Sequence, residues 1–389
     1  MNKLWFSLWL LLGAAHVFAQ DVVFTDALSR DADKYRVTLR LPTDGLFATE
    51  EQQLELRLRD LSRVDPVLGA TAVIRARIEA TITMPAMAAM PAIIEQAHAE
   101  AVPGDYGLHP VFAHGGDYLL TLRITLLTDE TLKFSFPLVV ADEAPARKTR
   151  LKPFELTLKT DPQKVKAGEA FVLRMQVWAN RETRDAYGFL TGKRVREAVT
   201  TFDTAHERKL HLMIVSRDFN FFAHQHPAPQ SDGSFVLRDF AFPCAGEFQL
   251  FADVAPHNAG SQILSATIKV ADKAACVKAD ETSDLQFTLL EGQTFVAEKT
   301  QPLTIRLQHA DGKTIEDIEP YLGALGHLMM IHADGKIFVH AHPDERDVMN
   351  GNGQLTFLVR PPKAGNYFAW LEVQRGGRVL RQRLTLKIF

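Results

Sequence analysis

Apolar and polar residues alternate in Tyr35-Arg-Val-Thr-Leu-Arg-Leu41, and the same period of two returns in Gln53–Leu58, Phe171–Trp178 and Leu380–Ile388. This period is typical of a half-buried β-strand, because successive side chains of a strand point to opposite faces. Gly, Pro, Asp and Asn separate the runs, as turns between strands require. The one segment with helical periodicity is Ala92–Ala101, where we expect a turn or two of helix. The patterning therefore predicts an all-β fold.

A shared ending divides the chain into three parts. Gly116, Gly246 and Gly365 each stand two residues before a Tyr or Phe that opens an alternating strand. The first two closing strands run into polar stretches at 143–152 and 273–283, which we interpret as boundaries. Modules of roughly 110–130 residues with about seven strands fit an immunoglobulin-like β-sandwich best. We expect three tandem immunoglobulin-like β-sandwich domains after a signal peptide, at residues 20–142, 150–272 and 283–389.

Length and composition exclude several classes of protein. The 389 residues suggest two or three domains, and 46% hydrophobic with 23% charged residues is ordinary for a globular chain, which excludes a disordered or coiled-coil protein. The 44 Lys and Arg nearly balance the 47 Asp and Glu, so nothing indicates a nucleic-acid partner. Two cysteines exclude a disulfide-rich scaffold and a cysteine-rich zinc module.

The first nineteen residues have the pattern of a signal peptide. Lys3 supplies a positive start, the apolar run Leu4–Ala15 follows, and Val17 and Ala19 are the small residues that signal peptidase accepts. The alternative is an N-terminal membrane anchor, but a spanning helix needs about 20 apolar residues. We expect cleavage after Ala19 and an exported protein that is not membrane-spanning, periplasmic in a Gram-negative host or otherwise secreted.

A histidine motif occurs twice, once in the second module and once in the third. The segment His211–Pro227 aligns without gaps to His327–Pro343, and eight of the seventeen aligned positions are identical. Three of the identical positions are histidine, with the same spacings in both copies. An internal repeat of this kind is the strongest signal in the sequence.

Each copy of the motif is expected to form a β-hairpin that gathers its histidines. Asp334-Gly335 is a preferred dipeptide for a two-residue type I′ turn, and centring the hairpin there places Met329 opposite His340 and His327 opposite His342. Opposed residues share a face of the sheet, as do residues two apart. Asp218-Phe219 is a poorer turn, so a longer loop is possible in the earlier copy. Its matching set comprises His211, Met213, His224 and His226.

Three imidazoles and a thioether on one face indicate a transition-metal site. Imidazole suits copper, zinc, iron and nickel, and a thioether shifts the preference toward copper, so we expect a copper ion, with a zinc ion as the alternative. Asp253 and Glu372 hold matching positions in the closing strands, where each could join the site or orient an imidazole. In the other interpretation, the histidines pack structurally at a sandwich edge.

The first module carries methionines instead. Met84, Met87 and Met90 recur at three-residue intervals beside prolines, which we expect to hold the backbone extended. Thioethers suit Cu(I) in an oxidising compartment, and His98, His109 and His114 downstream could contribute. Methionine also fills the edges of hydrophobic cores readily, which is the alternative interpretation.

Residues 35–140 resemble the YtkA-like and FixH-type periplasmic domains. The resemblance rests on Thr83-Met-Pro-Ala-Met87, on Pro103-Gly-Asp-Tyr106 and on the final strand from Gly116-Asp-Tyr118. It implies envelope copper handling, with copper-transport or cytochrome-oxidase-maturation envelope proteins as partners. FixH-type proteins are normally membrane-anchored, and this chain departs from them in that respect. The histidine modules resemble exported bacterial proteins that accompany such domains.

Cys244 and Cys276 complete the candidate residues. Export favours a disulfide between them, worth about 3–4 kcal/mol by loop entropy, over a thiolate pair that binds metal. The Gly-x-Ser-x-Gly, His-Glu-x-x-His and phosphate-loop signatures are missing from the sequence. The favoured hypothesis is therefore a non-enzymatic copper chaperone, buffer or sensor. The alternatives are an envelope interaction protein that binds a partner protein or glycan, and a metalloenzyme.

Overall fold

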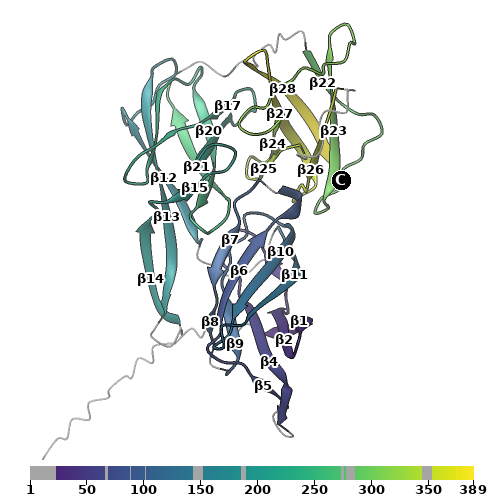
Figure 1. Cartoon of the computed structure of the whole chain (residues 1–389). Coiled ribbons are helices and arrows are strands. Elements are labelled where there is room, and N and C mark those ends of the chain that lie inside the picture. Colours follow the sequence, from purple (N-terminus) through teal and green to yellow (C-terminus); the bar gives the residue numbers. More distant parts are fainter. Residues whose placement is uncertain are drawn as a thin grey trace, which may run out of the picture.

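The computed structural model describes residues 23–65, 69–87, 89–100, 102–142, 152–184, 190–272, 276, 285–343 and 353–389. The predicted signal peptide, residues 1–19, lies outside these ranges. Within them the chain is nearly all β-strand, and its one helical element is the 3-10 turn η1 (Pro85–Met87). The predicted all-β fold of tandem sandwiches is therefore confirmed (Figure 1). In the described part of the chain, no helix is long and apolar enough to cross a bilayer.

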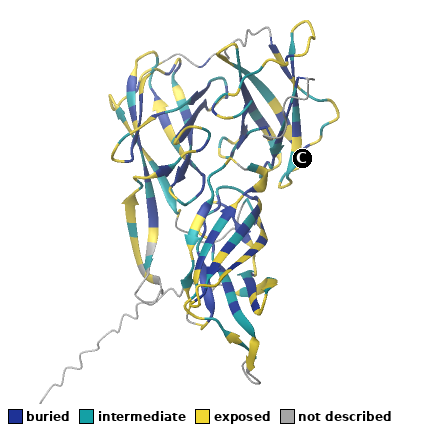
Figure 2. Cartoon of the chain, in the orientation of Figure 1, coloured by how far each residue is buried: buried dark blue, intermediate teal, exposed yellow. Residues whose placement is uncertain are grey.

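The first module, purple and blue in Figure 1, pairs two sheets. Their strand orders are β1-β2-β4-β9-β8, with β5 beside β4, and β3-β11-β10-β6-β7. Figure 2 shows buried and exposed residues alternating along these strands, as the period of two predicts. The strands are β1 (Phe24–Ala32), β2 (Tyr35–Pro42), β3 (Leu46–Phe47), β4 (Leu54–Asp65), β5 (Gly69–Ala72), β6 (Arg77–Thr83), β7 (Ile93–Gln96), β8 (His98–Ala99), β9 (Asp105–Leu108), β10 (Gly116–Thr125) and β11 (Thr131–Ala141).

The helix expected in Ala92–Ala101 is absent from the described residues there, which form β7 and β8 instead. Ile93 pairs with Ile82 of β6, and Ala99 pairs with Tyr106 of β9. The segment thus extends both sheets at their edges, and this tertiary pairing overrides its weak helical pattern.

The second module has the strand orders β12-β13-β19-β18, with β14 beside β13, and β15-β20-β16-β17, with β21 beside β20. Its strands are β12 (Phe154–Asp161), β13 (Phe171–Arg184), β14 (Leu190–Ala198), β15 (Phe202–Asp203), β16 (Leu210–Ser216), β17 (Phe222–Gln225), β18 (Ala228–Pro229), β19 (Phe235–Phe240), β20 (Gly246–Pro256) and β21 (Gln262–Val270).

The third module repeats this plan with the orders β22-β23-β26 and β25-β24-β27-β28. Its strands are β22 (Leu285–Leu289), β23 (Gln301–His309), β24 (His327–His332), β25 (Phe338–Ala341), β26 (Gln354–Val359), β27 (Gly365–Arg375) and β28 (Arg378–Ile388).

The repeated glycines have one backbone conformation. Gly116, Gly246 and Gly365 have φ angles of +146°, +139° and +140°, which residues with a side chain rarely adopt. Each starts a closing strand, and the aromatic residue two positions later is buried in the module's own core. The shared ending therefore specifies the same backbone conformation at the start of the last hairpin in all three modules.

The second and third modules pack against each other through a fourth apolar cluster, separate from the three module cores. Phe222 stacks on Trp370 with ring centroids 4.5 Å apart, and Phe338 stacks on Phe251 at 5.1 Å. The aligned repeat makes Phe222 equivalent to Phe338, so the two contacts are related by exchange of the modules. The interface therefore has approximate two-fold symmetry. The buried members of the cluster are Met213, Val215, Phe219, Phe222, Phe251, Met329, Ile331, Phe338 and Trp370.

Candidate metal centre

The two hairpins hold their histidines in the predicted registers. Met213 of β16 pairs with His224 of β17, and Met329 of β24 pairs with His340 of β25. The two central strands also pair with the closing strands, which places His211 opposite Asp253 and brings the acidic position into the same layer. The predicted pairing is thus confirmed in both copies.

The predicted two-residue turn at Asp334-Gly335 is wrong. The His332 amide donates to the Ile337 carbonyl oxygen at 3.0 Å, so the loop has four residues, and of its described residues Gly335 alone has a positive φ, +73°. A type I′ turn needs positive φ at both central residues. Compared with the predicted two-residue turn, the loop has one extra residue on each side of its centre. The strand register is therefore the one that the two-residue turn predicts.

His211, His224 and His226 form the first triad. His211 Nε2 lies 3.1 Å from the Ala205 carbonyl oxygen, so this nitrogen carries the proton and Nδ1 keeps a lone pair. His224 Nδ1 lies 2.8 Å from the Glu372 carboxylate, which likewise leaves its Nε2 with a lone pair. These two lone-pair nitrogens are 3.1 Å apart. A hydrogen bond between them would require a further proton, whereas a cation satisfies both.

His327, His340 and His342 form the second triad, with the same arrangement. His327 Nε2 donates to the Tyr321 carbonyl oxygen at 2.8 Å, and its Nδ1 lies 3.4 Å from His340 Nε2 and 2.9 Å from His342 Nε2. His340 Nδ1 lies 3.1 Å from the Asp253 carboxylate. Three ring nitrogens therefore converge, two of them with lone pairs fixed by their hydrogen bonds.

The supporting carboxylates are exchanged between the modules. Glu372 belongs to the third module and bonds His224 of the second, whereas Asp253 belongs to the second and bonds His340 of the third. Arg381 donates to the other oxygen of Glu372 through Nε at 2.7 Å. Of the two roles that the sequence allowed, the acidic residues therefore have the orienting one. Each triad is completed by a side chain from the neighbouring module.

The spacing of the converging nitrogens matches a tetrahedral ion. With metal–nitrogen bonds of about 2.0–2.1 Å, two ligands of such an ion stand about 3.3 Å apart. The nitrogen–nitrogen distances are 3.1 Å in the first triad and 2.9 and 3.4 Å in the second. All ligand atoms within each triad lie within 4.8 Å of one another. Each triad offers three nitrogens and leaves a fourth position open.

Burial disfavours the charged form of five of the triad histidines, namely His211, His226, His327, His340 and His342. Burial and the neighbouring histidines lower the pKa of His211 to about 2 and that of His226 to about 4. Burial also lowers the pKa of His327, His340 and His342 well below the usual value. Although burial alone would raise the pKa of Glu372, the His224 hydrogen bond and the Arg381 charge lower it to about 2. Neutral imidazole is the form that binds metal.

The two triads belong to one cluster, which includes a histidine that the sequence analysis missed. The ring centroid of His211 lies 6.3 Å from that of His327, and His206 stacks on His342 at 3.6 Å. The Nε2 atoms of His206 and His226 are buried without a hydrogen-bond partner. His206 aligns with Leu322 of the other copy, so the repeat carried no signal for it.

The methionines of the repeat lie directly opposite His224 and His340 in the two hairpins. Met213 and Met329 are fully buried in the apolar cluster between the modules. Their thioethers therefore help to hold the two modules together, beside the triads.

The methionines of the first module line a pocket that reaches the second triad. Met84, Met87 and Met90 share its wall with His340 and His342. The extended backbone expected there is wrong, since η1 is a 3-10 turn. Of the downstream histidines, His114 lines the pocket. His98 and His109 form a separate group with Glu100.

Cys244 and Cys276 form a disulfide. Cys244 precedes β20, and both cysteines are buried against the core of the second module. The bridge therefore ties the described residue of the following linker back to the module that carries the first triad.

The family model described as "Domain of unknown function (DUF8832)" matches residues 154–272 and 279–388. The chain belongs to this family. The two matched segments coincide with the two histidine modules, so one chain brings two DUF8832 copies together around the cluster. The matches leave residues 35–140 uncovered, and their resemblance to YtkA-like domains stays a prediction. No curated protein matches the chain.

Solved structures share its all-β architecture at low similarity. One is a tetra-tandem repeat from the extending region of a large adhesion protein, 12% identical, covering 92% of this chain and 82% of that one, with a TM-score of 0.22. Invasin, a bacterial integrin-binding protein, is 12% identical and covers 91% and 60%, with a TM-score of 0.20. A putative membrane-anchored protein from Corynebacterium diphtheriae is 11% identical and covers 91% and 89%, with a TM-score of 0.21. At these scores the likeness concerns the fold alone.

Proposed function

We propose that this chain is an exported transition-metal-binding protein that holds metal at the two histidine triads. One observation carries the proposal: in each triad, lone-pair nitrogens fixed by hydrogen bonds to a carbonyl and a carboxylate face each other at 3.1 to 3.4 Å. Neutral histidines whose other nitrogen is bonded to a carboxylate or carbonyl are the usual metal ligands. Export is inferred from the pattern of the first nineteen residues.

Copper is the first candidate ion and zinc the alternative. Three imidazoles suit both ions, and the open fourth position permits a metal to be taken up and released. The thioethers in the adjoining pocket favour copper, since zinc has less preference for them. Buffering copper or passing it to copper-transport or oxidase-maturation proteins of the envelope fits a site of this kind. A non-enzymatic role is proposed with it.

A proton is the alternative occupant of the space between the facing nitrogens of each triad. The number of metal ions that the protein retains distinguishes bound metal from a shared proton. Mature protein purified without a His-tag and incubated with Cu(I), Cu(II) or Zn(II) should retain about two ions after desalting. The variant His224→Ala/His226→Ala should lose one of them, and His340→Ala/His342→Ala the other. His257→Ala is the matched control, because His257 bonds Asp203 at the surface, outside the triads. Folded variants with unchanged metal content would overturn the assignment.

The second candidate is a non-catalytic envelope interaction protein. The structures of similar architecture include an adhesion protein and an integrin-binding protein, which agree with this candidate better than with copper handling. Exposed aromatic patches would support it, but of the large hydrophobic side chains exposed in the described part, Phe389 is the one aromatic. Retention of metal-free protein on an envelope fraction, equal for wild type and triad variants, would favour this candidate.

A further inference from the structure

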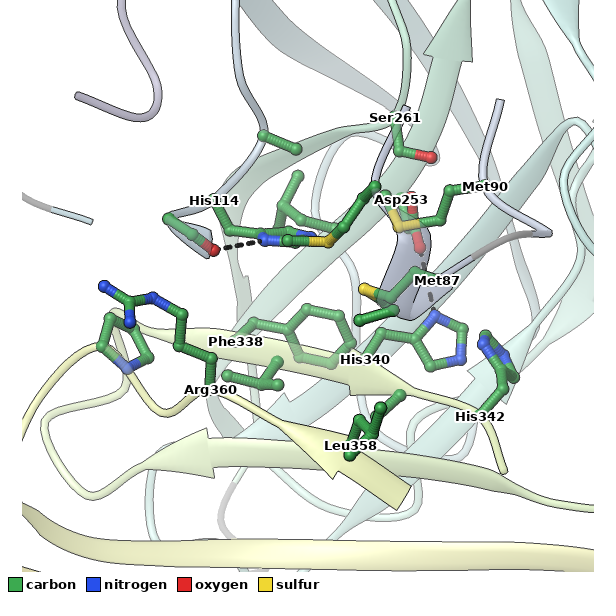
Figure 3. A pocket seen from close by; sticks show the side chains of 18 of the residues that line it. Met87, Met90, His114, Asp253, Ser261, Phe338, His340, His342, Leu358 and Arg360 are labelled. Atoms are coloured by element: carbon green, nitrogen blue, oxygen red, sulfur yellow. Dashed lines mark hydrogen bonds and ion pairs between the residues drawn. The ribbon is translucent and has the colours of Figure 1, made fainter. Parts of the chain in front are cut away.

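One pocket joins all three modules beside the second triad. It encloses about 890 Å³, including its open mouth. The first module contributes Met84, Met87 and Met90, the second Asp253, and the third His340 and His342. Figure 3 shows Met87 and Met90 on one side of this space and Phe338 and His340 on the other. Residues far apart in the sequence therefore place thioethers and imidazoles around a common space.

The local backbone explains why three methionines face the same way. The Met87 amide donates to the Met84 carbonyl oxygen at 2.9 Å, and the Met90 amide to the Met87 carbonyl oxygen at 3.0 Å. Such i to i+3 bonds give three residues per turn, which aligns side chains at three-residue intervals. Gly116 makes room for them, since a Cβ there would lie 2.3 Å from the Met84 methyl group. The three-residue spacing in the sequence thus brings the three methionines to one side of the turn, where they line the pocket.

Three of the four charged residues in the described lining of the pocket, Asp142, Asp253 and Arg360, have bonding partners. Asp253 bonds His340, and Arg360 forms an ion pair with Asp142 at 3.4 Å. His114 bonds the Gly115 carbonyl oxygen through Nδ1 at 3.0 Å, which leaves its Nε2 as a base. The lining keeps three thioethers and the imidazoles of His114 and His206 as donors, in largely apolar surroundings that include Phe338 and Leu358.

We propose that the methionine turn, which carries Met84, Met87 and Met90, binds Cu(I) and delivers it to the second triad. Thioethers are soft donors that select Cu(I) over zinc and the harder ions, and they resist the oxidation to disulfide that thiolates undergo after export. Delivery is an exchange of ligands, in which copper–sulfur bonds break as copper–nitrogen bonds to His340 and His342 form. The oxidation state of copper does not change. The sulfur site stands on its own, and the delivery step rests on the proposed function of the triads.

The pocket also distinguishes the two triads. His340 and His342 line it, whereas His211, His224 and His226 are absent from its described lining. Cu(I) that enters through the methionines therefore reaches the second triad first. The approximate two-fold symmetry of the modules ends at this point, because the first module covers one triad.

The test uses the full mature chain with Cu(I) kept reduced and X-ray absorption as the readout. Wild type at low copper should show copper–sulfur scattering, which gives way to copper–nitrogen scattering with time. Met87→Leu/Met90→Leu should lose the sulfur signal and load the second triad more slowly, with unchanged Zn(II) uptake. Met175→Leu, which changes a methionine in the core of the second module, is the control and should behave as wild type.

Three outcomes would overturn the proposal: persistent copper–sulfur scattering in the double variant, an equal loss in Met175→Leu, or no sulfur signal in wild type. The variant His340→Ala/His342→Ala separates this inference from the proposed function. It should keep the copper–sulfur signal, but that signal should no longer give way to copper–nitrogen scattering. Sulfur-bound copper in wild type without any nitrogen-bound metal would refute the triads as sites and leave the methionine site standing.

Discussion

Glu372 and His224 form a pair whose members come from different modules. Both side chains are 1% exposed, and the 2.8 Å bond between them fixes which nitrogen of His224 carries the proton. Glu372→Gln keeps the shape but removes the charge, so it weakens the hold on the imidazole and lowers its basicity. We expect metal affinity of the first triad to fall about 10–100-fold, with the second triad unchanged. Competition titration with a chromophoric chelator measures both affinities.

Asp253→Asn provides the reciprocal variant. Asp253 bonds His340, so this substitution should weaken the second triad and spare the first. If Glu372→Gln lowers the metal affinity of the first triad only and Asp253→Asn that of the second only, each triad depends on a carboxylate from the other module. Equal weakening of both triads by either variant would show instead that the carboxylates act on the interface as a whole.

The β16–β17 hairpin reaches across the interface with its tip. Phe219 is in the left-handed region at φ +58°, and its ring lies 4.3 Å from that of Phe368 in β27. Phe219→Ala removes a buried aromatic side chain, and we expect the free energy of unfolding to fall by about 3 kcal/mol or more. Gly335→Ala, at the equivalent tip and in open space, should cost only about 1–2 kcal/mol because of its φ alone. Chemical denaturation compares the two, and equal effects would mean that the Phe219 contact contributes nothing.

At the level of elements, the sequence predicts strand register well and turn geometry poorly. The spacing of histidines in the repeat determines that Met213 opposes His224, because a slip by one residue would turn every side chain to the other face. The four-residue loop at Asp334-Gly335 was missed, since two- and four-residue loops give the same register. The longer loop allowed for at Asp218-Phe219 is present, because the Ser216 amide donates to the Phe221 carbonyl oxygen at 3.0 Å. Ala92–Ala101 was misjudged because its partners, β6 and β9, lie outside the local pattern.

What the sequence could not predict depends on contacts between modules. The sequence placed Asp253 and Glu372 near the histidines of their own modules. That each of them bonds a histidine of the other module could be found only from the interface. His206 has no histidine counterpart in the repeat, and it joins the cluster through ring contacts with both triads, closest to His342. The methionine turn was interpreted within its own module, while its pocket is completed by the other two.

The whole molecule buries His206 and five of the triad histidines where neutral imidazole is favoured, and this makes its stability depend on pH. Burial lowers the pKa of His206, of His226 to about 4 and of His211 to about 2, and lowers those of the second triad as well. Between pH 6.5 and about 4 the unfolded chain therefore binds more protons than the folded chain. Stability must fall as the pH falls through this range, by up to about 1.4 kcal/mol per pH unit for each histidine.

We therefore expect the metal-free protein to lose thermal stability steadily from pH 7 to pH 5, as measured by calorimetry. Asp253, whose pKa is raised by burial, works in the opposite sense, since it retains a proton more readily when folded. Bound metal should steepen the loss, because protons compete with it for the same nitrogens. A flat profile would mean that the folded cluster takes up protons freely, in which case protons and not metal ions would bridge the facing nitrogens.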